Sequence, residues 1–361
     1  MNNFDTFLAQ LGNKSEKETG AISAPIHLST TYRHPGFGSS TGYDYTRTAN
    51  PTRDVLQEGL AVLEGGDQAI TTSSGMSAIQ LALQLFKNGS TYLCSRDLYG
   101  GSFRYFDVLE KDGQAKFVYF DDQQDFKKKL DESIDVVFIE TPTNPLMHVF
   151  DIEKICRAAQ AVGAKVIVDN TLLTPLRQRP LEVGADVVVH SGTKFLAGHN
   201  DIVAGVIVVK GEELAEKLFY LANTTGPALG PFDCWLFLRS LKTLRLRFDR
   251  QEENTKQFVE AFEKDERIKE ILYAGEGAMV SFRLESVDKV EPFLEKLDLF
   301  TFAESLGGVE SLVTYPTTQT HADIPEELRE SYGLTPDLVR FSIGIEDPQD
   351  LIDDVLQALD K

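Results

Sequence analysis

The sequence predicts an α/β fold built around a mostly parallel sheet, followed by a smaller α+β domain. From residue 68 to about residue 221, short apolar runs of strand length alternate with segments of helical periodicity, which is the rhythm of successive βαβ units. Beyond about residue 235 this rhythm gives way to one long polar helix with fewer strands. A chain of 361 residues is long enough to form one large and one small domain.

The first 50 residues are predicted to form an irregular arm. Pro25, Pro35 and several glycines interrupt any long periodicity there. An arm without a core of its own must pack against something, and a neighbouring subunit is one possibility. After the arm, Asn50-Pro51-Thr52 begins a predicted helix with apolar residues at helical spacing, and Gly65-Gly66 ends it.

Residues 51–235 are predicted to form the large domain. Its strands are expected at 68–73, 91–95, 115–120, 135–140, 165–169, 185–190 and 202–209. Its later helices are expected near 76–87, 101–110, 123–132, 151–162 and 211–221. A parallel sheet with helices on both faces binds its ligands at the carboxyl ends of its strands. The polar residues at four strand ends are therefore candidate site residues: 73–75, 140–142, 169–171 and 190–191.

Residues 236–361 are predicted to form the smaller α+β domain. A long helix is expected from Trp235 to about Lys264. Strands are expected near 268–273, 278–284 and 299–303, and helices at 287–297 and 348–359.

The composition narrows the possible partners. A net charge of −20 argues against nucleic acid or an anionic membrane surface as a partner. The three cysteines lack metal-ligand spacing and the six histidines are dispersed, so no metal site is expected. The cysteine usage, the absence of a signal-peptide pattern and the absence of a spanning apolar run together predict a cytoplasmic protein without a membrane partner.

Two charged residues stand at the ends of apolar strands. Lys194, in His190-Ser191-Gly192-Thr193-Lys194, follows a Val-rich run, and Asp169 ends a run of Val and Ile. A carboxylate at such a position is costly unless it is paired. One hypothesis is that Lys194 holds pyridoxal phosphate as a Schiff base and that Asp169 pairs with the ring nitrogen. The pattern leaves open a solvated surface lysine, and a helix N-cap or structural ion pair for Asp169.

A phosphate could bind near these residues. Ser74-Gly75-Met76 opens a predicted helix whose free N–H groups suit an anion, although serine is also a common N-cap. The hydroxyls of Ser191 and Thr193 flank a glycine just before Lys194 and could bind the same phosphate.

Three further side chains each have a functional and a structural interpretation. Tyr99 could stack on a cofactor ring or be an ordinary core tyrosine. Arg47 in the arm and Arg340 on a strand pattern suit phosphate or carboxylate ligands, but a solvated or ion-paired arginine is equally consistent with the pattern.

Taken together, these stretches resemble the Cys/Met-metabolism family of pyridoxal-phosphate enzymes, which have fold type I. The resemblance covers essentially the whole chain, and several short motifs in the same order are far more specific than any one of them. These motifs are GYDYTRTANPTR (42–53), SSGMSAI (73–79), DLYGGSFRYF (97–106), ETPTNPL (140–146), VIVDNT (166–171), HSGTKFLAGHND (190–201), SLGGVESL (305–312) and VRFSIGIEDPQDLI (339–352). Phe195, Leu172 and Ser240 depart from the commoner Tyr, Phe and Gly of relatives, and none of these changes removes a catalytic group.

The resemblance implies a role for each matching residue. Lys194 would hold the cofactor and shuttle protons, Asp169 would pair with the pyridine nitrogen, and Tyr99 would stack on the ring and help to deprotonate the incoming amine. The substrate's α-carboxylate would be held by Asn144 and Arg340, with Ser305 nearby. The cofactor would also be bound or surrounded by Ser74, Gly75, Met76, Thr171, Ser191, Thr193 and, from the neighbouring subunit, Tyr45 and Arg47. This makes a dimer the minimal active unit, and a homotetramer is the assembly that the resemblance implies.

Within the family the sequence is most similar to the bacterial cystathionine gamma-synthases. Glu304 resembles the acidic position of members that act at the γ-carbon, and Asp44 and Arg104 resemble positions that recognise the distal end of the substrate. The implied reaction is a γ-replacement of transsulfuration and methionine biosynthesis, in which an O-acylhomoserine and L-cysteine give cystathionine. Gamma-lyase, beta-lyase and O-acetylhomoserine sulfhydrylase activities are the alternatives. A non-enzymatic protein of the same fold would be expected to lack Lys194 or Asp169, and both are present.

Overall fold

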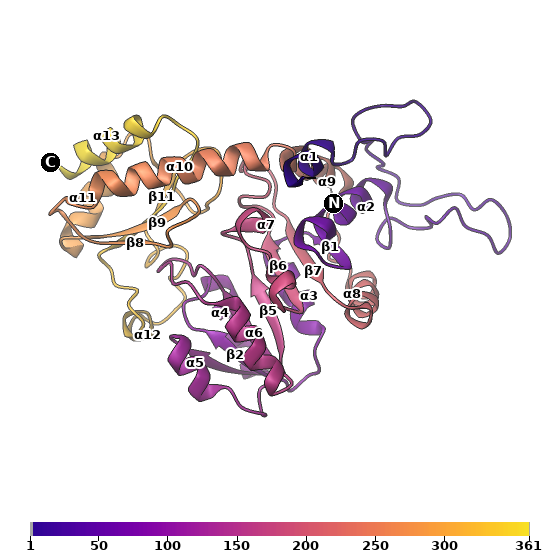
Figure 1. The fold of residues 1–361 in the computed structure, drawn as a ribbon, viewed down its shortest axis with the longest axis horizontal. Coiled ribbons are helices and arrows are strands. Elements are labelled where there is room, and N and C mark those ends of the chain that lie inside the picture. Colours follow the sequence, from indigo (N-terminus) through magenta and orange to yellow (C-terminus); the bar gives the residue numbers. More distant parts are fainter. Residues whose placement is uncertain (1–2, 361) are drawn as a thin grey trace.

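The seven apolar runs between residues 68 and 209 assemble into one sheet in the computed structural model, which describes residues 3–360 (Figure 1). The strands are β1 (Gln68–Thr72), β2 (Thr91–Ser95), β3 (Lys116–Phe120), β4 (Val136–Glu140), β5 (Lys165–Asp169), β6 (Val187–Ser191) and β7 (Gly205–Val209). Their order is β1-β7-β6-β5-β4-β2-β3. The strands from β6 to β3 pair in parallel, whereas β7 is antiparallel to both of its neighbours. The predicted mostly parallel sheet is confirmed.

Both faces of this sheet are covered, because its central strands are apolar at successive positions. In β5, Val166 and Val168 belong to the core on one face and Ile167 to the core on the other. The first core is completed by α2 (Pro51–Glu64), α5 (Gln123–Lys129), α6 (Ile152–Ala161) and α9 (Pro231–Leu241). The second is completed by α3 (Gly75–Gln84), α4 (Gly100–Lys111) and α8 (Glu212–Thr225). Two short segments, α7 (Thr174–Arg177) and the 3₁₀ turn η1 (Pro180–Val183), lie between β5 and β6.

The N-terminal segment is not irregular throughout, which corrects the prediction for residues 1–50. A short helix, α1 (Phe4–Gln10), begins at the N-cap Asn3, whose side chain accepts a hydrogen bond from Asp5 N. Leu8 is buried on this helix, and Leu11 just after it packs against Gly59 of α2. Beyond residue 13 the segment has no helix or strand until α2, and Figure 1 shows it extending away from the body of the molecule.

The single helix predicted from Trp235 to Lys264 is two helices, α9 and α10 (Leu244–Phe262). The break lies at residues 242–243. It is stabilised at the Ser240 carbonyl, which accepts hydrogen bonds from the Thr243 hydroxyl and from the Arg247 guanidinium. Because of this break, α10 leaves the large domain and continues over the smaller one (Figure 1).

The second sheet belongs to the C-terminal part of the chain. Its strands are β8 (Ile268–Tyr273), β9 (Met279–Leu284), β10 (Thr301–Phe302), β11 (Leu312–Thr314) and β12 (Leu338–Ser342), in the order β10-β11-β12-β9-β8. Its remaining helical segments are η2 (Val287–Lys289), α11 (Val290–Lys296), α12 (Glu326–Ser331) and α13 (Pro348–Leu359). One face of the sheet carries a core of phenylalanines shared with α10, among them Phe258, Phe282 and Phe341.

The opposite face of the second sheet is turned toward the large domain. In β12, Val339 and Phe341 enter the core beneath α10, so Arg340 between them points to the other face. On the same face of β9, the Ser281 hydroxyl donates a hydrogen bond to the Pro145 carbonyl of the large domain. Strand alternation therefore delivers Arg340 to the boundary between the domains. None of the helices within residues 3–360 is long and apolar enough to cross a bilayer.

Candidate active site

A cavity of about 290 Å³ lies at the carboxyl ends of the large sheet, where the C-terminal domain meets it. Thirteen of the residues predicted for the site contribute to its lining. They are Ser74, Gly75, Met76, Tyr99, Asn144, Asp169, Thr171, Ser191, Thr193, Lys194, Glu304, Ser305 and Arg340. The structure thus brings together residues that lie as far apart in the sequence as Ser74 and Arg340.

Four predicted residues lie outside this lining. Asp44, Tyr45 and Arg47 belong to the extended arm, where Arg47 hydrogen-bonds Asn223 at the end of α8 and Asp44 contacts His34. Arg104 on α4 forms an exposed ion pair with Asp323. The structure therefore does not bring these four residues to the cavity of their own chain, and their assignment to a neighbouring subunit or to the substrate's distal end stays a prediction.

Lys194 lies in the turn that follows β6, and its amine is inside the cavity. The Nζ atom donates a hydrogen bond of 2.9 Å to the hydroxyl of Ser305, which belongs to the C-terminal domain. Burial, together with the positive charge of Arg340, lowers the pKa of Lys194 to about 8, and the negative charge of Glu304 opposes this shift. The lysine is consequently poised to supply a neutral amine near physiological pH.

This depressed pKa predicts how the protein without cofactor takes up pyridoxal phosphate. At pH 7 a lysine of pKa about 8 is about one-tenth neutral, against about one in three thousand at its ordinary pKa. Only the neutral amine attacks the aldehyde, so the rate of covalent capture should rise with pH up to about 8 and level off above it. Stopped-flow absorbance between pH 6 and 10 measures this rate, with Lys194→Ala as the baseline. A rate that keeps climbing to pH 10 would show an ordinary amine.

The N-terminus of α3 forms one end of the cavity. The Ser74 hydroxyl caps this helix by accepting a hydrogen bond from Ser77 N at 3.0 Å. A Cβ on Gly75 would lie 2.9 Å from the Cβ of Ser191, so only glycine lets the start of the helix approach the end of β6 so closely. Free backbone N–H groups and serine hydroxyls face the same space, which is the chemistry of a phosphate site.

Asp169 lies on the wall of the cavity at the end of β5. Its Oδ1 atom accepts hydrogen bonds from the backbone N–H of Thr171 at 3.0 Å and from the Thr171 hydroxyl at 2.5 Å. In residues 3–360 no hydrogen bond is made to Oδ2. Burial raises the pKa of Asp169, a cost that a cationic partner inside the cavity would offset.

Arg340 is buried, and no carboxylate of residues 3–360 is in direct contact with it. Its guanidinium donates to Asn144 Oδ1 at 2.8 Å, to the Ser305 carbonyl at 2.8 Å and to the Thr314 hydroxyl at 3.0 Å. All three acceptors are neutral, and within the described chain the Nε atom has no partner. Burial lowers the pKa of Arg340 to about 10, which still leaves it charged at pH 7. A buried cation in this state is matched to a carboxylate ligand.

Two elements of the site have no role assigned from the sequence, although Glu140 is among the strand-end residues proposed there as candidates. Glu140, at the end of β4, is buried beside the cavity and accepts a hydrogen bond from Tyr99 N at 3.0 Å. Burial, together with the charges of Asp169 and Asp97, raises the pKa of Glu140 well above its ordinary value. The sequence signal for Glu140 is a carboxylate at the end of an apolar strand, which is the same signal that points to Asp169.

The second unassigned element is the segment around Thr320 and His321. Thr320 lines the cavity, and the buried His321 places Nε2 3.2 Å from the Leu98 carbonyl and 3.1 Å from the Asn144 carbonyl. Burial lowers the pKa of His321 to about 4, so the ring is neutral and Nε2 is the protonated nitrogen that faces both acceptors. The segment thus connects the loops of Tyr99 and Asn144 through hydrogen bonds from His321. No local pattern in the sequence predicts this role.

The residues present fit pyridoxal phosphate. The cavity offers a phosphate cradle at α3, an aromatic ring at Tyr99, a carboxylate with an unused oxygen at Asp169 and a lysine of lowered pKa between them. These are the groups needed to bind a phosphorylated pyridine aldehyde and to anchor it covalently.

Comparisons with known proteins agree with this chemistry. The family model described as "Cys/Met metabolism PLP-dependent enzyme" matches residues 5–360. A protein of Bacillus subtilis named cystathionine gamma-synthase/O-acetylhomoserine (thiol)-lyase is 50% identical over 98% of this chain and 96% of its own length. The cystathionine gamma-synthase of Haemophilus influenzae is 49% identical over 98% of this chain and 97% of its own.

Solved structures and other enzymes of the family also match. The crystal structure of cystathionine gamma synthase from Xanthomonas oryzae pv. oryzae in complex with aminoacrylate and cysteine has a TM-score of 0.96 and 39% identity, covering 99% of this chain and 97% of its own. Enzymes named cystathionine gamma-lyase and cystathionine beta-lyase match at 40% and 41% identity. Overall similarity therefore supports the class of reaction and not one substrate specificity.

Proposed function

The chain belongs to the Cys/Met metabolism family of PLP-dependent enzymes, and on that basis we propose that it catalyses γ-replacement, converting an O-acylhomoserine and L-cysteine to cystathionine and the free acid. The observation that carries this choice is the position of Glu304 in the cavity lining, beside Lys194. A γ-replacement brings two amino acids together. Arg340 suits the carboxylate of the first, and Glu304, which has no hydrogen-bond partner among residues 3–360, suits the ammonium group of the second.

The proposed mechanism assigns the proton transfers to Lys194. Pyridoxal phosphate, when bound, acts as an electron sink that makes the protons near a linked amino group easier to remove. Lys194 Nζ takes the α-proton of the acylhomoserine, for which its pKa of about 8 is suited. Nζ gives this proton up to the bound cofactor, which leaves Nζ neutral again and able to take a β-proton. The Cγ–O bond breaks and the acyl group leaves as a carboxylate. The thiol of cysteine loses its proton as its sulfur forms the new bond to Cγ, so the carboxylate and this proton together make up the free acid. The α- and β-protons return to the product through Lys194 Nζ.

The remaining residues hold the substrate and cofactor in place. Arg340 and Asn144 would bind the α-carboxylate of the substrate. Ser305 couples this group to the base, because its carbonyl accepts from Arg340 while its hydroxyl accepts from Lys194. Asp169 would hold the ring nitrogen protonated, Tyr99 would stack on the ring, and the start of α3 with Ser191 and Thr193 would bind the phosphate.

Product analysis tests the proposed reaction. Purified holoenzyme is given O-acetyl- or O-succinylhomoserine, each with cysteine or with sulfide, and separately cystathionine alone. We expect cystathionine as the main product whenever cysteine is present. Rapid release of 2-oxobutyrate from cystathionine would instead identify a gamma-lyase, and release of pyruvate with homocysteine would identify a beta-lyase.

A second activity is favoured by one comparison. The Bacillus subtilis relative is named for both cystathionine gamma-synthase and O-acetylhomoserine (thiol)-lyase activity. Sulfide lacks the ammonium group that Glu304 is proposed to bind, so it would use the same cavity without that contact. The sulfide arm of the product analysis measures this activity as homocysteine.

Replacing Glu304 by alanine should shift the products. Without this carboxylate, we expect the yield of cystathionine to fall and the balance to move from γ- toward β-chemistry, with the KM for cysteine rising about tenfold as one charge-assisted contact is lost. Chromatography of the products with O-acetylhomoserine and cysteine measures both effects. The matched control is Glu310→Ala, whose side chain binds Asn200 outside the cavity lining. An unchanged product ratio in Glu304→Ala would argue against the role.

The arm supports a proposal about assembly. Ile22, Leu28 and Phe37 are 75%, 69% and 111% exposed in the single chain, which is unusual for large apolar side chains that come so close together in sequence. We propose that a second copy covers them, that Tyr45 and Arg47 then reach the phosphate of that copy, and that two such dimers form a tetramer. The three cysteines are all buried free thiols, which supports a cytoplasmic location as part of the same proposal.

A further inference from the structure

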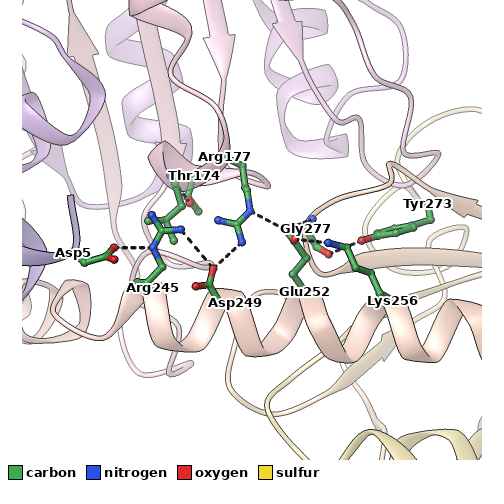
Figure 2. Close-up of polar contacts among 10 residues, drawn as sticks. Asp5, Thr174, Arg177, Arg245, Asp249, Glu252, Lys256, Tyr273 and Gly277 are labelled. Carbon is green, nitrogen blue, oxygen red and sulfur yellow. Dashed lines mark hydrogen bonds and ion pairs between the residues drawn. The ribbon is translucent and has the colours of Figure 1, made fainter. Parts of the chain in front are cut away.

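Three arginines around the start of α10 differ in their partners. Arg177 of α7 contacts Asp249 and Glu252, and Arg245 contacts Asp5 and Asp249, as Figure 2 shows. These are ordinary ion pairs that connect α1, α7 and α10. Arg247, one turn into the same helix, is only 5% exposed and forms no salt bridge within residues 3–360. A buried guanidinium without a carboxylate needs a different explanation.

Two of the partners of Arg247 are main-chain carbonyls of the segment that bears Lys194. Its Nη1 atom donates to the Phe195 carbonyl at 2.9 Å, and its Nη2 atom donates to the Leu196 carbonyl at 3.2 Å and to the Ser240 carbonyl at 3.1 Å. The segment is a hydrogen-bonded turn, in which Gly198 N donates to the Lys194 carbonyl at 2.7 Å. The carbonyls of residues 195 and 196 point out of this turn, and Arg247 satisfies both.

Gly198 leaves room for this guanidinium because it has no Cβ. Its φ is +69°, and a Cβ at this position would lie 1.8 Å from Arg247 Nη1. On its other side the turn is held by Gly307, whose Cβ would lie 2.6 Å from Phe195 N and 3.0 Å from the Lys194 carbonyl carbon. The turn is therefore enclosed by close contacts from α10 and from the loop that carries Ser305.

We propose that Arg247 is a positioning residue for Lys194: by binding the two carbonyls that follow the lysine, it fixes the turn so that Nζ stays at Ser305 and at the reacting carbons. This proposal depends on the proposed function only in naming the reaction that is measured. The contact itself acts on Lys194 whatever amino acid the enzyme converts. A displacement of about 1 Å at a catalytic group can lower a rate about a hundredfold, so a rigid turn has a direct catalytic value.

The test compares two variants that disturb the same contact from opposite sides. Arg247→Met removes all four hydrogen bonds of the guanidinium, the fourth of which runs from Nε to the Thr243 hydroxyl, and Gly198→Ala displaces the guanidinium while leaving Arg247 in place. Arg245→Met is the control for losing an arginine of α10. Gly163→Ala is the control for backbone strain, because Gly163 has a φ of +82° with open space around it.

Two measurements separate positioning from stability. Borohydride reduction at timed intervals after pyridoxal phosphate is added, followed by peptide mass spectrometry, gives the rate at which Lys194 traps the cofactor and the final fraction that holds it, and both are independent of which reaction the enzyme runs. Turnover per bound cofactor, with the KM for O-acylhomoserine, gives the catalytic effect. In both variants we expect kcat per bound cofactor to fall about tenfold to a hundredfold, trapping of Lys194 to slow by at least about tenfold, and KM to change less than about threefold.

Coupling between the variants decides the outcome. The double variant should be no worse than the poorer single one, because both remove one contact, and Arg247→Lys should restore part of the loss. If kcat per bound cofactor and trapping equal those of the controls, or if the two losses multiply, Arg247 has only a structural role. Arg247→Lys and Gly198→Ala keep the test decisive if Arg247→Met does not fold. If the protein makes no cystathionine but Lys194 trapping still falls in these variants, the proposed reaction fails while the positioning role stands.

Discussion

Replacing Lys194 by alanine should abolish both the visible absorption band of the bound cofactor and turnover. The substitution removes the covalent anchor and the base together, and a positioned base alone contributes about a hundredfold to ten-thousandfold. We therefore expect kcat to fall at least about a thousandfold. Spectra of the purified protein with added pyridoxal phosphate and a coupled assay for the released acid measure the two losses.

The fold should survive this substitution. Lys194 is buried and its pKa is depressed, so its charged form is less stable in the folded protein than in the unfolded chain. This penalty is present below pH about 8 and fades as the pH rises toward the ordinary lysine pKa. At pH 7 the cofactor-free alanine variant should melt no lower than the unaltered cofactor-free protein. Lys165→Ala, at the opposite end of a strand in the same sheet, is the control and should keep its band and its activity. Near-normal turnover in Lys194→Ala would overturn the assignment.

The large sheet could be predicted from the sequence because its signal is local. The strands 91–95 and 165–169 have the predicted bounds, since a short apolar run flanked by polar residues is buried on both faces wherever it lies in such a sheet. α1 could not be predicted in the same way. A helix of seven residues is marginal by propensity, and the burial of Leu8 and Leu11 against distant residues stabilises it.

The break between α9 and α10 has the same kind of cause. Helical periodicity continues across residues 242–243, so the sequence predicts one helix. The Ser240 carbonyl instead accepts hydrogen bonds from Thr243 and from Arg247, and Arg247 also donates to two carbonyls of the turn after Lys194. A contact between residues about 50 positions apart leaves no trace in a local pattern.

The residues of the candidate site likewise fall into two groups, those with a local sequence signal and those positioned by contacts distant in sequence. Asp169 and Lys194 could be proposed from pattern because the carboxyl ends of parallel strands lie at one edge of the sheet. Glu304 and Ser305 were identified through the family resemblance, because the predicted strand that they follow, 299–303, belongs to the smaller domain and gives no reason to place them at this edge of the large sheet. His321 was predicted neither from the pattern nor from the family resemblance, because the carbonyls that it contacts are 223 and 177 positions away in the sequence. What the sequence predicts least well is the contribution of the C-terminal domain to a site organised by the large one.

Replacing Arg340 by methionine should weaken substrate binding more than any other change that leaves the cofactor in place. Arg340 is a buried cation whose partners in the described chain are an amide oxygen, a carbonyl and a hydroxyl, so the α-carboxylate would be its first anionic partner. Removing one partner of a buried charged pair costs about 2–5 kcal/mol, which corresponds to about 30- to 4,000-fold in kcat/KM. Steady-state kinetics with O-acetyl- and O-succinylhomoserine measure the loss.

The visible band of the cofactor separates this effect from a general loss of structure. Among residues 3–360 the Arg340 guanidinium donates only to Asn144, Ser305 and Thr314, and not to Asp169 or the start of α3, so the band of Arg340→Met should persist while the KM for O-acetyl- and O-succinylhomoserine rises. Arg340→Lys, which keeps the charge without the two-pronged geometry, should recover part of the binding. Arg283→Met, on the neighbouring strand, is the matched control. It loses its ion pair with Glu270 and should lower the melting temperature without changing KM. An Arg340→Met enzyme with a normal KM would mean that the carboxylate binds elsewhere, and it would remove the physical reason for a buried, unpaired arginine at the meeting point of the two domains.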